Sequence, residues 1–129
     1  MQIEHIGISV EDPMKMAKWY QNNLNCIIKL QKGDKNRGVA FISDKSNSIL
    51  IELFSLQEVK KYKADLKNPL KIHIAFSSKN IEEDMQKLIN NGAIFIEECN
   101  QKLPGDQLYL LKDPWNNVIQ LVQRKTSLL

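Results

Sequence analysis

The feature of this sequence that most restricts its fold is an internal repeat. The chain contains two histidines, His5 and His73, and the offset between them is 68 residues (73 − 5). At this offset four segments align without a gap: HIGIS with HIAFS, YQNNLN with LINNGA, VAFIS with QLYLL, and ILIELF with NVIQLV. Chance readily matches one histidine but not four segments. The sequence therefore predicts two successive copies of one folding unit.

Each copy predicts the same order of secondary structure. A strand of alternating polarity that carries the histidine comes first, and a helix follows it. The first helix is expected to begin at Asp12-Pro13, because proline is favoured at the first helical position. Asn80 and Glu83 form a capping box for the second helix, and Gly92 suits its C-terminal end. Three strands complete each copy, the first of them faint in the first copy. The clearer strands are expected at Val39–Ser43, Ser48–Leu56, Ile94–Glu98, Gln107–Lys112 and Val118–Gln123.

The expected fold is α+β. Two tandem βαβββ modules would form a curved, cup-like mixed sheet with the helices outside. The first module spans residues 1–61 and the second spans residues 71–129. A lysine-rich linker at 62–70 contains the turn-forming pair Asn68-Pro69. The two modules together would make one domain, with a tight hairpin turn at the sequence DPWNN that begins at Asp113.

Composition excludes several classes of protein. The chain has 129 residues, of which 43% are hydrophobic and 26% charged, and a formal net charge of +3. No apolar run has the length of a membrane span, and no basic surface interleaved with aromatic residues indicates nucleic-acid binding. Cys26 and Cys99 form no redox or metal motif, so a reduced, cytoplasmic protein is expected. The expected partner is a small molecule rather than a membrane or a nucleic acid.

The residues that carry chemistry occupy equivalent places in the two copies. Glu52 is a lone carboxylate between apolar neighbours, and a charge there requires a cation, a hydrogen-bond network or water. It follows His5 by 47 residues, and Gln120 follows His73 by the same number. If the two copies pack about a pseudo-twofold axis, these four side chains converge. Two imidazoles, one carboxylate and one amide suit a divalent ion such as Zn²⁺, Ni²⁺, Co²⁺, Fe²⁺ or Mn²⁺.

The small residues beside the histidines suggest a cavity. Gly7 and Ser9 share a strand face with His5, and Ala75 lies two residues after His73. The other residues expected to line the cavity are Phe54, Tyr109, which the repeat aligns with Phe41, and Trp115 in the hairpin turn.

These features resemble the vicinal oxygen chelate superfamily. Its members include glyoxalase I, methylmalonyl-CoA epimerase, extradiol dioxygenases, fosfomycin-resistance transferases and metal-free bleomycin-binding proteins. HIGISVEDPMKMAKWYQNNLN is similar to the family's opening segment and KDPWNNVIQLVQ to its closing segment. The resemblance covers nearly the whole chain and implies a glyoxalase-like fold.

The resemblance places the four family metal ligands on His5, Glu52, His73 and Gln120. Bacterial glyoxalase I generally has a glutamate where this chain has Gln120. The arginine that binds glutathione in glyoxalases is replaced by Ser9, which argues against glutathione as substrate. The iron dioxygenases need an acid at the position of Gln120, so dioxygenase chemistry is disfavoured.

The expected function is therefore a metal-dependent isomerase or lyase. It would catalyse metal-assisted proton transfer on a small substrate that chelates the ion through oxygens, with Glu52 as the catalytic base. Two alternatives stay open from the sequence. One is a metal-free binding or resistance protein, and the other is an epimerase of a 2-substituted acyl thioester. A homodimer is expected, because family modules pair either within a chain or between chains.

Overall fold

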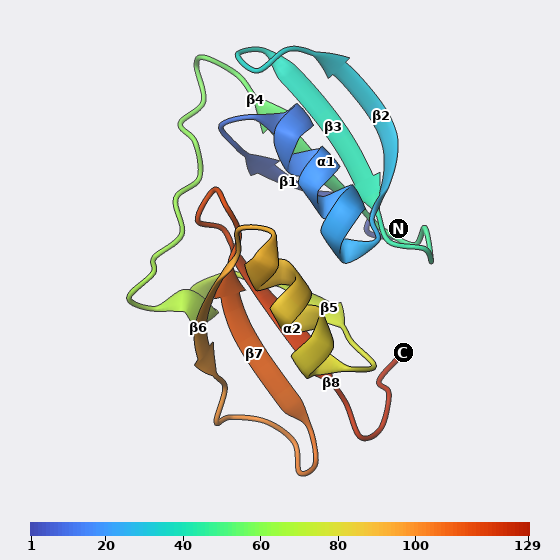
Figure 1. Ribbon diagram of the computed structural model, residues 1–129. Helices are drawn as coiled ribbons and strands as arrows, with labels where there is room; N and C mark the ends of the chain where they lie inside the picture. Colours follow the sequence, from blue (N-terminus) through green and yellow to red (C-terminus); the bar gives the residue numbers. More distant parts are fainter. The chain divides into compact units, whose positions relative to one another are not determined.

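The computed structural model describes all 129 residues and contains two compact units, Met1–Tyr62 and Lys63–Leu129. Each unit has one helix and one four-stranded mixed sheet, so the α+β class and the order βαβββ are confirmed (Figure 1). The first unit contains β1 (His5–Ser9), α1 (Pro13–Leu24), β2 (Ile27–Gly33), β3 (Gly38–Ser43) and β4 (Leu50–Ser55). The second contains a short 3₁₀ turn, η1 (Pro69–Lys71), then β5 (Ile74–Ser77), α2 (Ile81–Asn90), β6 (Ile94–Glu98), β7 (Gln107–Lys112) and β8 (Val118–Gln123).

Both sheets have the same strand order. The order is β1-β4-β3-β2 in the first unit and β5-β8-β7-β6 in the second. The first and last strands of each unit are parallel, and the other pairs are antiparallel. The faint strand of the first copy is β2, an edge strand with a bulge between Ile28 and Leu30. Most of its residues are exposed, which explains why its sequence lacks clear alternation.

The expected caps position both helices. The Asp12 side chain accepts a hydrogen bond from the Lys15 backbone N–H, at 3.1 Å, and proline occupies the first helical turn. In α2 the Asn80 side chain accepts from the Glu83 backbone N–H and donates to the Glu83 carboxylate. Gly92 follows α2 with φ of 100°, a conformation that glycine adopts without steric cost. Neither helix is long and apolar enough to cross a membrane.

Each helix covers one face of its own sheet. Met16, Ala17 and Tyr20 of α1 are fully buried, as are alternate residues Ala40 and Ile42 of the β3 strand beneath. Because strand residues alternate between faces, the opposite face of the first sheet carries the side chains of His5, Phe41, Glu52 and Phe54, with Gly7 among them. The face that α1 leaves uncovered therefore carries the first copy's polar candidates.

The uncovered face of the second sheet is packed differently. Gln123 accepts a hydrogen bond from the Ile81 backbone N–H at the start of α2, which marks the helix side of β8. The other face holds a hydrophobic cluster of Cys99, Leu108, Leu110, Val118 and Val122, against which Ala64 and Ile96 also pack.

The gapless repeat alignment is wrong in the third strand of the copies. Phe41 pairs with Glu52, whereas the residue that pairs with Gln120 is Leu110, not Tyr109. The reason is the hairpin turn, which has six residues (44–49) in the first unit and five (113–117) in the second. A shift of one residue moves each side chain of a strand to the other face of the sheet.

Tyr109 accordingly lies on the helix side of its sheet. Its hydroxyl donates a hydrogen bond to the Glu82 carboxylate of α2, and its side chain is buried beside Phe95. The hydrogen bond to Glu82 raises the pKa of Tyr109 to about 12, with burial as the second cause. The expected equivalence with Phe41, which placed Tyr109 in a cavity, is therefore wrong.

We predict that Glu82→Gln lowers the pKa of Tyr109 towards the ordinary value of about 10. A raised tyrosine pKa stabilises the fold below pH 10, and this contribution is lost as the pH rises through about 12. Titration of tyrosinate absorbance, with Tyr109→Phe to assign the signal, tests the shift. Glu97→Gln removes a carboxylate from the neighbouring strand and should leave the pKa in place. An unchanged titration in Glu82→Gln would refute the assignment.

Candidate functional site

His5 and Glu52 come together on the uncovered face of the first sheet. The parallel pairing of β1 with β4 places Gly7 opposite Glu52, and the His5 Nε2 atom lies 3.5 Å from the Glu52 Oε2 atom. A Cβ atom on Gly7 would lie 2.9 Å from the same carboxylate oxygen, closer than a real Cβ contact allows. The missing side chain at Gly7 therefore makes room for the Glu52 carboxylate beside the imidazole.

Other side chains hold the His5 ring in place. Its Nδ1 atom makes a hydrogen-bonded ion pair with Glu4, and its ring meets Phe41 edge to face, with centroids 5.8 Å apart. The hydrogen bond that the imidazole donates to Glu4 raises the pKa of His5 most, and the charges of Glu4 and Glu52 add to it against the opposing effect of burial. Since Nδ1 faces Glu4, the Nε2 atom is the one directed at Glu52.

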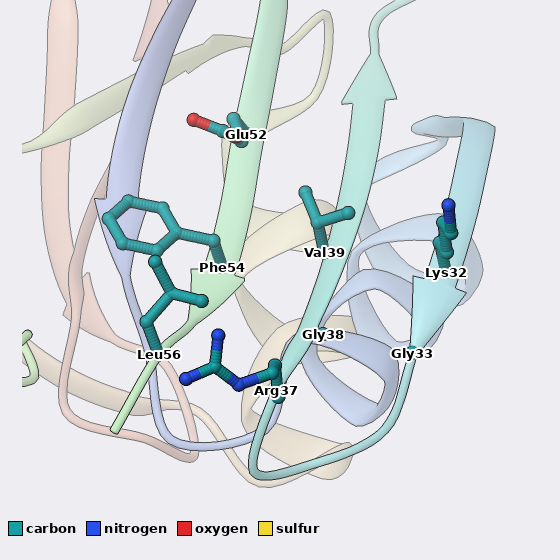
Figure 2. A pocket seen from close by; sticks show the side chains of 8 residues that line it. All are labelled: Lys32, Gly33, Arg37, Gly38, Val39, Glu52, Phe54 and Leu56. Carbon is teal, nitrogen blue, oxygen red and sulfur yellow. The ribbon is translucent and has the colours of Figure 1, made fainter. Parts of the chain in front are cut away.

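A cavity of about 500 Å³ lies in the first unit with Glu52 at one end (Figure 2). Phe54, Val39 and Leu56 form its apolar wall. Lys32 and Arg37 line it from the two sides of the β2–β3 hairpin turn, together with Gly33 and Gly38. The cavity thus offers a carboxylate, an apolar surface and two cations.

The second unit places its candidates in a more enclosed setting. His73 directly precedes β5, and its Nδ1 atom is buried without a hydrogen-bond partner. Ala75 pairs with Gln120, as Gly7 pairs with Glu52. Gln120 is 6% exposed, and its Nε2 atom lies 3.4 Å from the Cys99 sulfur. Burial raises the pKa of the Cys99 thiol, which keeps it protonated beside the amide.

A second cavity, of about 490 Å³, lies in the second unit. Ala75, Ser77 and Val122 line it from the sheet, and Ser127–Leu129 contribute from the end of the chain.

The remaining predicted site residues are placed as follows. Ser9 lies on β1 and is 8% exposed, and its hydroxyl has no hydrogen-bond partner. Trp115 is half-buried in the hairpin turn, where its backbone N–H donates to the Asp113 carboxylate at 2.8 Å.

Sequence reasoning missed three charged residues of the first unit's site. Glu4 directly precedes His5 in the sequence. Lys32 directly precedes the segment GDKNRG (33–38), which joins β2 to β3, and Arg37 lies within it. The two glycines in that segment were the available signal for a hairpin turn beside the site.

The sequence matches a family model over residues 2–121, that of the Glyoxalase/Bleomycin resistance protein/Dioxygenase superfamily. The chain belongs to this superfamily. No curated protein matches the chain.

Solved structures share the superfamily fold at low sequence identity. A glyoxalase family protein from Bacillus cereus has a TM-score of 0.73 at 16% identity, over 95% of this chain and 93% of that one. The antibiotic binding protein TnmS3 from Streptomyces sp. CB03234 has a TM-score of 0.71 at 13% identity, over 97% of each chain. The fosfomycin resistance protein FosX from Listeria monocytogenes has a TM-score of 0.70 at 16% identity, over 97% of this chain and 94% of that one.

The first unit of this superfamily member brings two of the four predicted metal ligands together. Two donors held about 2.1 Å from one ion at a tetrahedral angle are about 3.4 Å apart, and His5 Nε2 lies 3.5 Å from Glu52 Oε2. The Gly7 gap beside Glu52 keeps this arrangement open. No group of three His, Cys, Asp or Glu side chains gathers in either unit in a way that could hold an ion. The spacing of His5 and Glu52 therefore fits two ligands of one ion, and the remaining ligands would have to come from other groups.

We predict that Glu4→Gln lowers the raised pKa of His5 more than Glu52→Gln does, because the hydrogen bond from His5 to Glu4 is the largest cause of the shift. Protonated His5 stabilises the fold below pH about 6.5, and the contribution disappears as the pH rises through the raised value. Gly7→Ala displaces the Glu52 carboxylate and should lower the pKa as Glu52→Gln does. NMR titration of the imidazole protons in chelator-treated protein measures this, with His73→Ala as the assignment control. A larger effect of Glu52→Gln would contradict the ranking.

Proposed function

We propose that the protein is a metal-dependent isomerase or lyase that moves a proton on a small, oxygen-chelating substrate. The observation that carries this proposal is the approach of His5 Nε2 to Glu52 Oε2, at the end of a cavity in the first unit. Membership of a superfamily that includes glyoxalases supports it. The buried, unpartnered Nδ1 of His73 supports it further, because a buried imidazole nitrogen without a partner costs stability unless a ligand satisfies it.

The proposed ligands are His5, Glu52, His73 and Gln120. We propose that the protein is a homodimer. A divalent ion held by the proposed ligands would stabilise negative charge on a substrate oxygen while a neighbouring C–H loses its proton. The chain would use imidazole nitrogens and a carboxylate, which suit borderline metals, whereas Gln120 supplies a neutral amide oxygen.

Glu52 is the proposed base. It is the only carboxylate among the four residues, and an amide such as Gln120 has no useful basicity. Its carboxylate is about one-quarter exposed and lies in the cavity, where a substrate C–H can reach it. Because one group can take and return a proton, Glu52 alone is sufficient for a 1,2-shift. Phe54 and Phe41 flank it and would limit the access of water.

We predict that the purified protein holds about one divalent ion per site, and that His5→Ala/His73→Ala holds little. Elemental analysis of both proteins after identical purification measures this. Glu52→Gln should weaken metal binding at least tenfold. Replacing a residue that only hydrogen-bonds to a metal ligand already lowers metal affinity by about that factor. Glu11→Gln, which removes an exposed carboxylate close in sequence to β1, is the matched control. Equal metal content in the parent and the double variant would exclude the proposed function.

A second candidate is a metal-free small-molecule binding protein of the same fold. The absence of a three-residue metal cluster from either unit, together with the apolar wall of the first cavity, favours it. The likeness to an antibiotic binding protein is compatible with it. In that case removal of metal ions with a chelator would leave ligand binding unchanged, whereas the proposed enzyme would lose its activity. An epimerase acting on a 2-substituted acyl thioester is a variant of the first proposal and would need a second proton-transfer group.

A further inference from the structure

We infer that the substrate has an apolar segment that ends in an anionic oxyacid group, a carboxylate or a phosphate, which binds at Arg37. This inference rests on the proposed function, because it assigns the reactive end of the substrate to the Glu52 end of the first cavity. The residues that carry it lie at the β2–β3 hairpin turn of the first unit.

The lining of the cavity is ordered by polarity. Figure 2 shows Glu52 at one end, Phe54 and Val39 in the middle, and Arg37 beside Leu56 towards the hairpin turn. Glu52 is its sole anionic lining residue. Glu52 would repel an anionic group, and Arg37 at the other end would attract it. The cavity would therefore bind an elongated ligand in one orientation, with its anionic end at Arg37.

The strand register gives the length of that ligand. Glu52 pairs with Phe41, and Gly38 lies three residues further along β3 towards the hairpin turn. At the rise of an antiparallel strand this separates the two ends by about 10 Å. The expected substrate therefore carries several carbon atoms between its chelating oxygens and its anionic end.

The hairpin turn holds Arg37 in a defined position. The Asp34 carboxylate accepts hydrogen bonds from the backbone N–H groups of Asn36 and Arg37, at 2.8 and 3.0 Å. A Cβ atom on Gly33 would lie 2.1 Å from the Arg37 carbonyl oxygen, and one on Gly38 equally close to the Asp34 carbonyl oxygen. Only glycines fit at both ends of so close a turn. The backbone that carries Arg37 is therefore fixed before a ligand binds.

The guanidinium itself is available to a ligand. It pairs with Glu58 at 3.0 Å, and both side chains are largely exposed, at 63% and 59%. Exposed ion pairs of this kind contribute little stability, so a ligand anion can replace Glu58. Arginine also binds carboxylates and phosphates through two parallel hydrogen bonds. Glu58 would thus occupy the anion site of the free protein.

The experiment uses four probes of six carbon atoms each that differ in their end group: hexanoate, hexylphosphonate, hexan-1-ol and hexylammonium. They are titrated into the full-length, chelator-treated protein, and the backbone amide NMR signals of Gly33 and Gly38 report binding. We predict that the two anions bind about tenfold more tightly than the alcohol, and that the ammonium binds most weakly. The stronger of the two anions identifies the oxyacid. Equal affinities for hexanoate and hexan-1-ol, or no saturable binding of any probe, would overturn the inference.

Variants of the hairpin test the assigned residues. Arg37→Ala should reduce the anion affinities to that of hexan-1-ol and leave the alcohol unaffected, and Arg37→Lys should restore part of the difference. Glu58→Gln should tighten anion binding, because it removes the competing carboxylate. Lys35→Ala removes the same charge from the same turn without lining the cavity and should change little. A loss of anion preference in Lys35→Ala equal to that in Arg37→Ala would show a general charge effect instead of a site.

Metal content separates this inference from the proposed function. Arg37→Ala should keep the metal content of the parent, and His5→Ala should keep the anion preference. A parent protein without metal that still prefers anions refutes the enzyme and keeps the anion site. A parent with metal whose anion affinity is unaffected by Arg37→Ala refutes only the anion site.

Discussion

The parallel pairing of the first and last strands is the constraint on which the site of each unit depends. It sets Gly7 beside Glu52 in one unit and Ala75 beside Gln120 in the other. Parallel strands cannot be joined by a tight turn, so the intervening helix and two strands form the crossover between them. The crossover spans 40 residues in each unit (10–49 and 78–117), and the histidine and its last-strand partner lie 47 residues apart across it. Side chains far apart in sequence therefore become neighbours on one face of a sheet.

The same geometry leads to different chemistry in the two units. In the first, Glu52 meets His5 at the end of a cavity that extends to the β2–β3 hairpin. In the second, Gln120 is buried and touches Cys99, a member of the hydrophobic cluster. The Cys99 backbone N–H donates to the Leu108 carbonyl, so Cys99 and Leu108 occupy the pairing places of Lys32 and Val39. A cation in one unit is thus replaced by a buried thiol in the other.

Much of the fold could be predicted from the sequence because its signals are local. Asp12-Pro13 and the Asn80–Glu83 capping box mark the helix starts, and both caps form as expected. The approach of His5 to Glu52 followed from the repeat and from strand alternation. The place of Tyr109 could not be predicted, because an alignment without gaps does not detect that the turn at 113–117 is one residue shorter than the turn at 44–49. The contact of Glu4 with His5 depends on side-chain rotamers, and the cavity beside Arg37 depends on a hairpin turn. The periodicity of the sequence indicates neither of them.

The shorter turn at 113–117 has a consequence for how such a protein can change. One codon lost from a hairpin exchanges the inner and outer surfaces of the strand before it, while its backbone pairing is kept. Tyr109 accordingly stands where Ala40 stands in the first unit, on the surface that faces the helix, and its hydroxyl reaches Glu82 of α2. A change of one residue in such a turn thus replaces the whole set of side chains on each surface of a strand at once.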